Sequence, residues 1–291
     1  MLLEYVPGTL GDGGLIMPNV ELRPSIKLSL WRRMAAAIWG HPSDPTIYAR
    51  LEVDMAKALE FAEKLGRTRK VRITPTHLVA RAVALALRAY PEANAIVRIG
   101  GIRQRRRVHL FFHVAVPGEQ IDLTGVVVHD ADLKGPAEIA QQLQAEAVAA
   151  RRGEDREFSK ARRRLQRTPA WLLRGVLRWL DFFQYSLNLD PRWFGLARDA
   201  FGGAMITSVG SLGIPEAFAP LVPLTRAPMV VAVGKVEPKP VVREGTIVIR
   251  PVCVLGATLD HRVFDGLLAS KAAKFVLRYL ADPAKEEGTV M

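Results

Sequence analysis

The segment from His77 to Tyr90 constrains the fold more strongly than any other part of the chain. Its residues, HLVARAVALALRAY, place apolar side chains at helical spacing on most faces of a helix, and Pro91 ends the segment. A helix of this kind must be covered by other parts of the protein on most of its faces. The sequence therefore predicts a largely buried helix inside a globular domain.

Further helical and strand-like segments alternate around this helix. Amphipathic periodicity predicts helices, whereas β-branched and aromatic runs bounded by Gly and Pro predict strands. The charged turn at 242–245 indicates a hairpin in the last third of the chain. The order of elements predicts an α/β fold. The expected elements are helices at 55–65, 136–152 and 265–280, and strands at 108–116, 125–128 and within 204–258.

Composition excludes several classes of protein. With 49% hydrophobic and 24% charged residues, the chain is typical of globular proteins and unlike disordered ones. Its single cysteine, Cys253, excludes an intramolecular disulfide framework and a multi-cysteine zinc site, and no metal site is expected. Residues 1–19 lack a basic start and contain scattered Gly, so we expect an irregular arm rather than a signal peptide. We expect a cytoplasmic protein.

The net charge of +12 comes from two basic segments. Residues 98–107 contain five arginines and no acidic residue, and residues 151–178 contain ten basic against three acidic residues. These segments account for the whole excess, so the rest of the chain is balanced. Such patches fit nucleic acid, an anionic membrane surface or a phosphate-bearing ligand, and they are also common on solvated surfaces. Because only charge supports nucleic acid, we expect no nucleic-acid partner.

Residues 159–198 interrupt the alternation with a long helical stretch that contains three of the five tryptophans. Arg174 and Arg178 lie one helical turn apart, opposite much of an apolar surface that includes Trp171 and Leu180. A basic amphipathic helix with aromatic residues can lie on an anionic membrane. The other interpretation is an insertion packed on its own domain or on a neighbouring subunit.

The most informative chemical motif is His261-Arg262-Val263-Phe264-Asp265-Gly266, between a predicted strand and the closing helix. A histidine held on such a turn can act as a general base near neutral pH. A carboxylate four residues later can order the turn by pairing with an arginine. The hexapeptide alone is a weak pattern, and its context strengthens it.

With four other segments, this motif resembles the catalytic domain of the dihydrolipoyl acyltransferases of 2-oxoacid dehydrogenase complexes. These segments occur in the family's order and spacing, and the resemblance covers about 20–285. It implies a chloramphenicol acetyltransferase-like two-layer sandwich with a mixed sheet, in which 159–198 is a helical insertion and 286–291 a polar tail. The motif LDHRVFDG lies at 259–266, and the other segments lie at 73–95, 126–143, 202–214 and 229–251.

The resemblance assigns catalytic roles to three residues. It implies that His261 removes a proton from a thiol, which then attacks an acyl thioester without an acyl-enzyme intermediate. It implies that the Thr207 hydroxyl stabilises the tetrahedral oxyanion, with the adjacent Ser208 as the alternative. Asp265 resembles the family's structural carboxylate, which orders the histidine loop. The candidate partners of Asp265 are Lys27, Arg32 and Arg33.

The resemblance also implies an assembly and a substrate. The family is trimeric, with the active site between subunits, and coenzyme A or acyl-coenzyme A is its substrate. The chain contains neither a lipoyl domain nor a peripheral-subunit-binding domain, so a separate lipoyl-bearing protein is a candidate partner. The segment PGEQIDL at 117–123 replaces a family loop near the acyl donor, so dihydrolipoamide is not assigned as a substrate. The polar end at 281–291 favours an isolated trimer.

The sequence thus predicts a coenzyme A-dependent acyltransferase. The alternative is a catalytically idle relative that serves as a scaffold or a membrane-surface protein through 159–198. We expect His109 and His113 to be packed rather than catalytic. His129 and Asp130 are discounted as a dyad because adjacent strand residues point to opposite faces, and Cys253 is expected to be a buried thiol.

Overall fold

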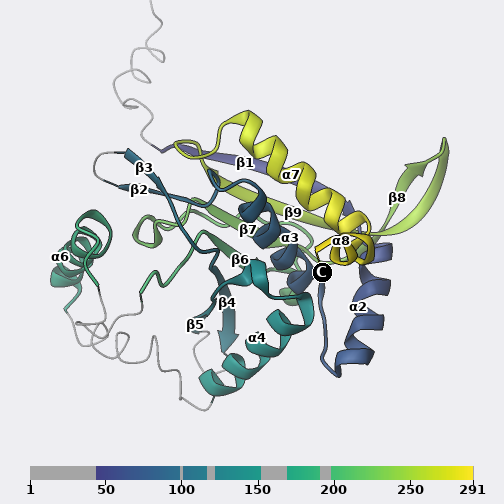
Figure 1. Cartoon of the computed structure of the whole chain (residues 1–291), viewed down its shortest axis with the longest axis horizontal. Coiled ribbons are helices and arrows are strands. Elements are labelled where there is room, and N and C mark those ends of the chain that lie inside the picture. The colour runs from purple at the N-terminus through teal and green to yellow at the C-terminus, as the bar shows by residue number, and fades with distance from the viewer. Residues whose placement is uncertain (1–43, 99–100, 117–121, 152–168, 191–197, 291) are drawn as a thin grey trace, which may run out of the picture. The chain divides into compact units, whose positions relative to one another are not determined.

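A mixed seven-stranded sheet forms the centre of the described structure (Figure 1). The computed structural model describes residues 44–98, 101–116, 122–151, 169–190 and 198–290. Six strands lie in the order β1-β9-β7-β6-β4-β5, and β8 pairs with β9. Strand β6 is parallel to β4 and to β7, whereas the other pairs are antiparallel. The strands are β1 (Thr46–Asp54), β4 (Leu110–Val116), β5 (Asp122–Val128), β6 (Ala204–Ser208), β7 (Met229–Val233), β8 (Glu237–Arg243) and β9 (Thr246–Asp260).

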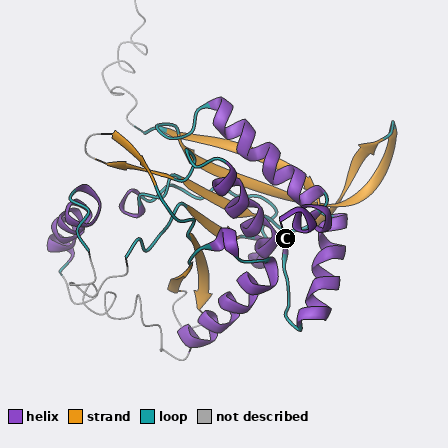
Figure 2. Ribbon diagram, viewed as in Figure 1, coloured by secondary structure: helices purple, strands orange, loops and turns teal. Residues whose placement is uncertain are grey.

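Helices cover one face of this sheet, so the prediction of an α/β fold with a mixed sheet is confirmed (Figure 2). The largest hydrophobic cluster joins these helices to inward-facing residues of every strand from β4 to β9 except β8. A smaller two-stranded hairpin is formed by β2 (Ala95–Arg98) and β3 (Gly101–Gln104). The helices are α2 (Ala56–Arg69), α3 (Pro75–Ala89), α4 (Pro136–Arg151), α6 (Ala170–Asp181), α7 (Gly266–Ala281) and α8 (Pro283–Val290).

Helix α3 is the buried helix that the sequence predicts. Every residue from Leu78 to Leu87 is buried. Pro75 begins the helix, where its missing N–H costs no hydrogen bond. The Thr74 backbone N–H donates to His77 Nδ1 at 3.1 Å, which closes a capping box with histidine in the third helical position. Burial lowers the pKa of His77 to about 4, so the imidazole is neutral at pH 7.

Because burial keeps His77 neutral at pH 7, we expect the protein to lose stability in acid. The unfolded chain protonates His77 near its usual pKa of 6.5, whereas the folded chain resists protonation until about pH 4. The free energy of unfolding should therefore fall between pH 6.5 and pH 4, by about 2–3 kcal/mol from this residue. His77→Gln keeps the capping acceptor and removes the titration. Urea denaturation of both proteins from pH 7 to pH 4.5 tests this, and parallel curves would contradict it.

The first strand of the sheet was not predicted. β1 pairs along its whole length with the second half of β9, from Thr46↔Asp260 to Asp54↔Val252. The signal is the alternation in TIYARLEVD, whose apolar Leu51 and Val53 face the main hydrophobic cluster. In contrast, the expected hairpin around 242–245 is confirmed, because Arg243 pairs with Thr246 across the turn.

The end of the chain differs from the expected polar tail at 286–291. Residues 283–290 form helix α8, and Glu287 is only 6% exposed. Its carboxylate pairs with Arg81 of α3, with distances of 2.8 and 3.2 Å, and also accepts a hydrogen bond from the Tyr279 hydroxyl at 2.7 Å. Arg81 Nη1 donates further to the Asp132 carbonyl. A charged residue can pack inside a protein when it is paired in this way, which composition does not reveal.

Candidate active site

His261 lies on a tight turn that follows β9. The Asp260 carbonyl accepts hydrogen bonds from the backbone N–H groups of Val263 and Phe264, at 2.9 and 2.8 Å. The His261 N–H donates to the Pro45 carbonyl at 2.7 Å, next to the start of β1. Backbone contacts therefore hold the turn on both sides, and the His261 side chain is left exposed.

The orientation of the His261 ring fixes its tautomer. Its Nδ1 lies 2.7 Å from the Phe264 carbonyl oxygen. Because a carbonyl can only accept, the proton of the neutral ring must lie on Nδ1, which leaves the Nε2 lone pair available to take a proton. The Phe264 side chain is fully buried and lines an apolar cavity of about 50 Å³ between the sheet, α3 and α7. The group that orients the imidazole is thus anchored in the core.

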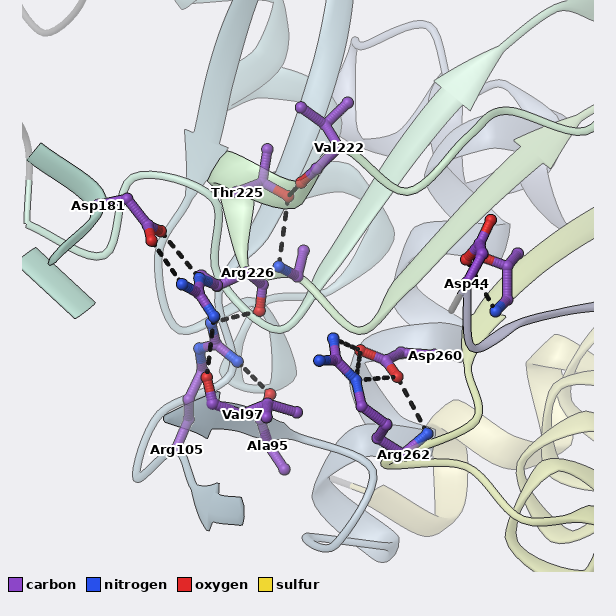
Figure 3. Close-up of polar contacts among 12 residues, drawn as sticks. Asp44, Ala95, Val97, Arg105, Asp181, Val222, Thr225, Arg226, Asp260 and Arg262 are labelled. Atoms are coloured by element: carbon purple, nitrogen blue, oxygen red, sulfur yellow. Dashed lines mark hydrogen bonds and ion pairs between the residues drawn. The ribbon is translucent and has the colours of Figure 1, made fainter. Parts of the chain in front are cut away.

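Asp260 is a functional candidate that sequence reasoning missed. Its carboxylate is buried and accepts from both the backbone and the guanidinium of Arg262, with a shortest distance of 2.7 Å (Figure 3). This pairing raises the pKa of Arg262. The ion pair braces the two residues on either side of His261. In the sequence, the opposite charges of Asp260 and Arg262 on either side of His261 were the pattern that could have indicated this ion pair.

Asp265 caps the closing helix. Its Oδ1 accepts from the Leu268 N–H at 2.7 Å and satisfies one of the free donors at the start of α7. Since Asp265 is four residues after His261, the cap also fixes the end of the histidine turn. Within the described residues, no Arg or Lys side chain pairs with Asp265. The three candidate partners, Lys27, Arg32 and Arg33, lie outside the described residues.

Thr207 is the second-last residue of strand β6, and its side chain is half-buried. Its hydroxyl has no hydrogen-bond partner among the described residues, so it can donate to a bound ligand. The neighbouring Ser208 is also half-buried, and its carbonyl accepts from the Ser211 hydroxyl at 2.7 Å. The alternation of side chains places Thr207 and Ser208 on opposite faces of the sheet.

The sheet register keeps Thr207 and His261 apart within one chain. Thr207 pairs with Ala232 of β7, and Ala232 pairs with Gly256 of β9. His261 follows Gly256 by five residues, which corresponds to about 16 Å along an extended strand. In addition, β6 and β9 are separated by β7, so the distance across the sheet adds two inter-strand spacings. One chain therefore cannot bring its own imidazole and its own hydroxyl to the same reacting atom.

Comparison with known proteins identifies the family. The model of the family described as 2-oxoacid dehydrogenases acyltransferase (catalytic domain) matches residues 25–158 and 197–286, which is well over half of the chain. The chain belongs to this acyltransferase family. Enzymes of the family use acyl-coenzyme A as a substrate.

Curated relatives agree with this assignment. The chain is 24% identical over 216 residues to the acetyltransferase component of the pyruvate dehydrogenase complex of Bacillus subtilis, covering 73% of this chain and 39% of the relative. It is 26% identical over 240 residues to the acetyltransferase component of the acetoin cleaving system of the same organism, covering 80% and 49%. The acyltransferase chain therefore spans less than half the length of these relatives.

Solved structures show the same fold at low sequence identity. The cubic core of the pyruvate dehydrogenase multienzyme complex has a TM-score of 0.61 at 19% identity, covering 91% of this chain and 96% of that chain. A probable dihydrolipoamide acetyltransferase from Listeria monocytogenes 4b F2365 also has a TM-score of 0.61 at 19% identity, covering 89% and 94%. The predicted chloramphenicol acetyltransferase-like fold, shared by this acyltransferase family, is thereby confirmed.

The family model leaves 159–196 of this acyltransferase unmatched, close to the expected insertion at 159–198. The described part comprises α6 and a short π-helical turn, Phe182–Ser186. Asp181 pairs with Arg226, just before β7, and both carboxylate oxygens take part (Figure 3). Arg226 precedes Pro228, whose carbonyl accepts from the Asp260 N–H. The insertion is thus tied to the end of the sheet that carries His261.

Two arginines of the first basic segment are structural in this acyltransferase. Arg98 donates to the carbonyls of Tyr185 and Ser186 in the insertion, at 2.6 and 3.1 Å. Arg105 donates to the carbonyls of Ala95 and Arg226, as Figure 3 shows. These guanidinium groups hold the insertion and neighbouring loops together. They are therefore not a free basic surface for a polyanion.

The other candidate residues from the sequence are packed inside the protein, and burial makes the Cys253 thiol a poor nucleophile. His109 is buried, and its Nδ1 accepts from the Asp130 N–H at 3.0 Å. The rings of His109 and His129 are in edge contact, with centroids 4.8 Å apart. Cys253 is fully buried, and burial raises its thiol pKa to about 11. In the described ranges, we find no group of His, Cys, Asp and Glu able to hold a metal ion.

Proposed function

We propose that the protein is a coenzyme A-dependent acyltransferase that uses His261 as its general base. The observation that carries this proposal is the hydrogen bond between His261 Nδ1 and the Phe264 carbonyl, because it leaves Nε2 as the basic atom. Nε2 removes the proton from the attacking group of the acceptor. The acceptor then attacks the acyl carbonyl, and the proton on Nε2 passes to the departing coenzyme A thiolate. No acyl-enzyme is formed.

Thr207 stabilises the oxyanion of the tetrahedral intermediate in this proposal. Its hydroxyl has no hydrogen-bond partner in the described ranges, so it can donate to that oxygen as negative charge develops. Asp265 and Asp260 are positioning residues, because the first caps α7 after the histidine turn and the second braces Arg262. Each acts on the base without contacting the substrate.

The active site lies between subunits of a homotrimer. The register that separates Thr207 and His261 supports this arrangement, since a second chain must supply the missing partner. A ring of three chains gives three equivalent sites, each with the base of one chain and the hydroxyl of the next. Light scattering is expected to give the mass of three chains, and a much larger particle would contradict an isolated trimer.

Coenzyme A release tests the proposed function. The purified protein is incubated with acetyl-, propionyl- and longer acyl-coenzyme A, together with thiol, hydroxyl and amine acceptors. Turnover with one class of acceptor supports the proposal and identifies that acceptor, including dihydrolipoamide or a separate lipoyl protein. An intact trimer without turnover on any acceptor would reject it in favour of a scaffold.

A second candidate function is contact with a membrane surface through the insertion. The exposed apolar side chains of this segment include Leu172, Trp179 and Phe182, and Arg178 is exposed on the same helix. Aromatic and basic residues together favour the surface of an anionic bilayer. No described helix is long and apolar enough to cross a membrane.

Vesicle binding distinguishes this surface from an inert insertion. Wild type should sediment with vesicles containing anionic phosphatidylglycerol and not with phosphatidylcholine alone. The double change Trp179→Ala/Phe182→Ala should weaken binding about tenfold, because it removes most of the exposed aromatic area. Leu133→Ala, at an exposed position outside the insertion, is the matched control. Equal sedimentation of both variants would rule out this candidate.

A further inference from the structure

A second polar side chain lies beside Thr207 on the same face of the sheet. Strands β4 and β6 run parallel, with Phe111 opposite Met205 and Phe112 opposite Ile206. Continuing this register by one residue places His113 opposite Thr207. Phe111 and Met205 belong to the hydrophobic cluster on the face away from the main core. Because side chains alternate along strands, His113 and Thr207 share that face.

The neighbours of this pair are small or apolar. On β5, His113 pairs with Gly125, and on β7, Thr207 pairs with Ala232. The Phe111 ring fills the place that a side chain would take at Gly125, where a Cβ would lie 1.9 Å from the ring. The same ring contacts the His113 imidazole edge-on, with centroids 5.1 Å apart. His113 and Thr207 are therefore the polar residues of an otherwise small and apolar row.

Among the described residues, neither His113 nor Thr207 has its side-chain hydrogen bonds satisfied. His113 Nδ1 is buried and has no hydrogen-bond partner in the part of the chain that the structure describes. The Thr207 hydroxyl has none among the same residues. Leaving a buried polar atom without a partner costs about 1–3 kcal/mol, so such atoms in a native protein require an explanation. Both side chains are half-buried. Because His113 Nδ1 is buried, the imidazole can reach a ligand only through Nε2.

The protonation state of His113 suits a hydrogen-bond donor. Burial lowers its pKa below the usual 6.5, so the ring is neutral at pH 7 and carries one N–H. A neutral imidazole can donate to a developing oxyanion without becoming a proton donor in the reaction. The base at His261 has its ring oriented by the Phe264 carbonyl, whereas none of the described residues orients His113 through a hydrogen bond.

We infer that His113 is a second oxyanion donor, which acts together with the Thr207 hydroxyl on the acyl oxygen. This inference rests on the proposed acyl transfer and adds a catalytic residue to it. The donors come from adjacent strands, so the rigid sheet fixes their separation before substrate binds. No proton is transferred to or from His113 during the reaction.

Substitution of His113 tests this role in the intact trimer. His113→Leu removes the donor, and we expect kcat to fall about 10²-fold, because this hydrogen bond strengthens in the transition state. KM for acyl-coenzyme A should change less than about threefold, since ground-state binding is largely retained. His113→Gln keeps an N–H donor and should recover about tenfold of the lost kcat. Thermal melting and light scattering verify that each variant remains a folded trimer.

A double-mutant cycle separates catalysis from packing. If the two donors act on one oxygen, His113→Leu should cost much less in a Thr207→Val background than in wild type. His109→Gln is the matched control on the same side of the sheet, because His109 Nδ1 already accepts from Asp130. An active wild type with unchanged kcat in His113→Leu would overturn this inference alone. An inactive wild type would overturn the proposed function, and this inference with it.

Discussion

His261→Ala is expected to lower kcat by about 10²–10⁴-fold, because it removes the general base. The acceptor must then lose its proton to water, while acyl-coenzyme A still binds. KM should therefore change little. The His261 side chain is exposed and its turn is held by backbone hydrogen bonds, so the variant should fold normally. Steady-state coenzyme A release, with melting temperature as the folding control, measures the effect.

Mixing two inactive variants gives a sharper version of this prediction. His261→Ala retains the hydroxyl of Thr207, and Thr207→Val retains the base. In trimers refolded or co-expressed from equal amounts, about one quarter of the sites combine an intact base from one chain with an intact hydroxyl from the next. Activity should therefore return to about a quarter of the wild-type value. If both groups acted within one chain, the mixture would stay inactive.

Glu287→Gln should destabilise the protein by about 3–5 kcal/mol, because it leaves the buried Arg81 guanidinium without a counter-charge. Arg81 is 4% exposed and Glu287 6%, so water cannot replace the lost partner. The change also weakens the hydrogen bond from the Tyr279 hydroxyl, whose pKa is raised by burial. Urea denaturation at pH 7 measures the loss.

Two further variants identify the cause. In Arg81→Met/Glu287→Met no charge is left buried, and most of the stability should return, because apolar replacement of a buried ion pair is often neutral. Glu60→Gln breaks the exposed pair with Lys64 and should cost less than about 0.5 kcal/mol. A Glu287→Gln variant as stable as Glu60→Gln would show that α8 is not held by this pair.

Local sequence pattern predicted much of the fold, and long-range pairing explains what it missed. The apolar run of α3 and the turn between β8 and β9 carry their signals within a few residues. β1 also alternates, but its role depends on pairing with β9 about two hundred positions later. Helix α8 was missed because the polar Glu287 is buried only through its contact with Arg81.

In the candidate site too, local sequence pattern revealed the motif but not the contacts between distant residues. The motif around His261 could be recognised in the sequence, and resemblance to a family indicated Thr207. Asp260 was not considered, and His113 was expected to be packed rather than catalytic. The roles proposed for them depend on an ion pair and on a strand register. Histidines on apolar strands are usually packed, as His109 is. Only the three-dimensional structure distinguishes His113, because its Nδ1 has no partner among the described residues.

The opposite placement of His261 and Thr207 along the sheet has an evolutionary consequence. Substitutions around the base and substitutions around the hydroxyl affect distant parts of one folded chain, so their effects on folding are independent. The surroundings of the base and those of the acyl oxygen can therefore change separately. The insertion is attached at the His261 end through Arg226, and it could be acquired there without disturbing the pairing of β6, the strand that carries Thr207.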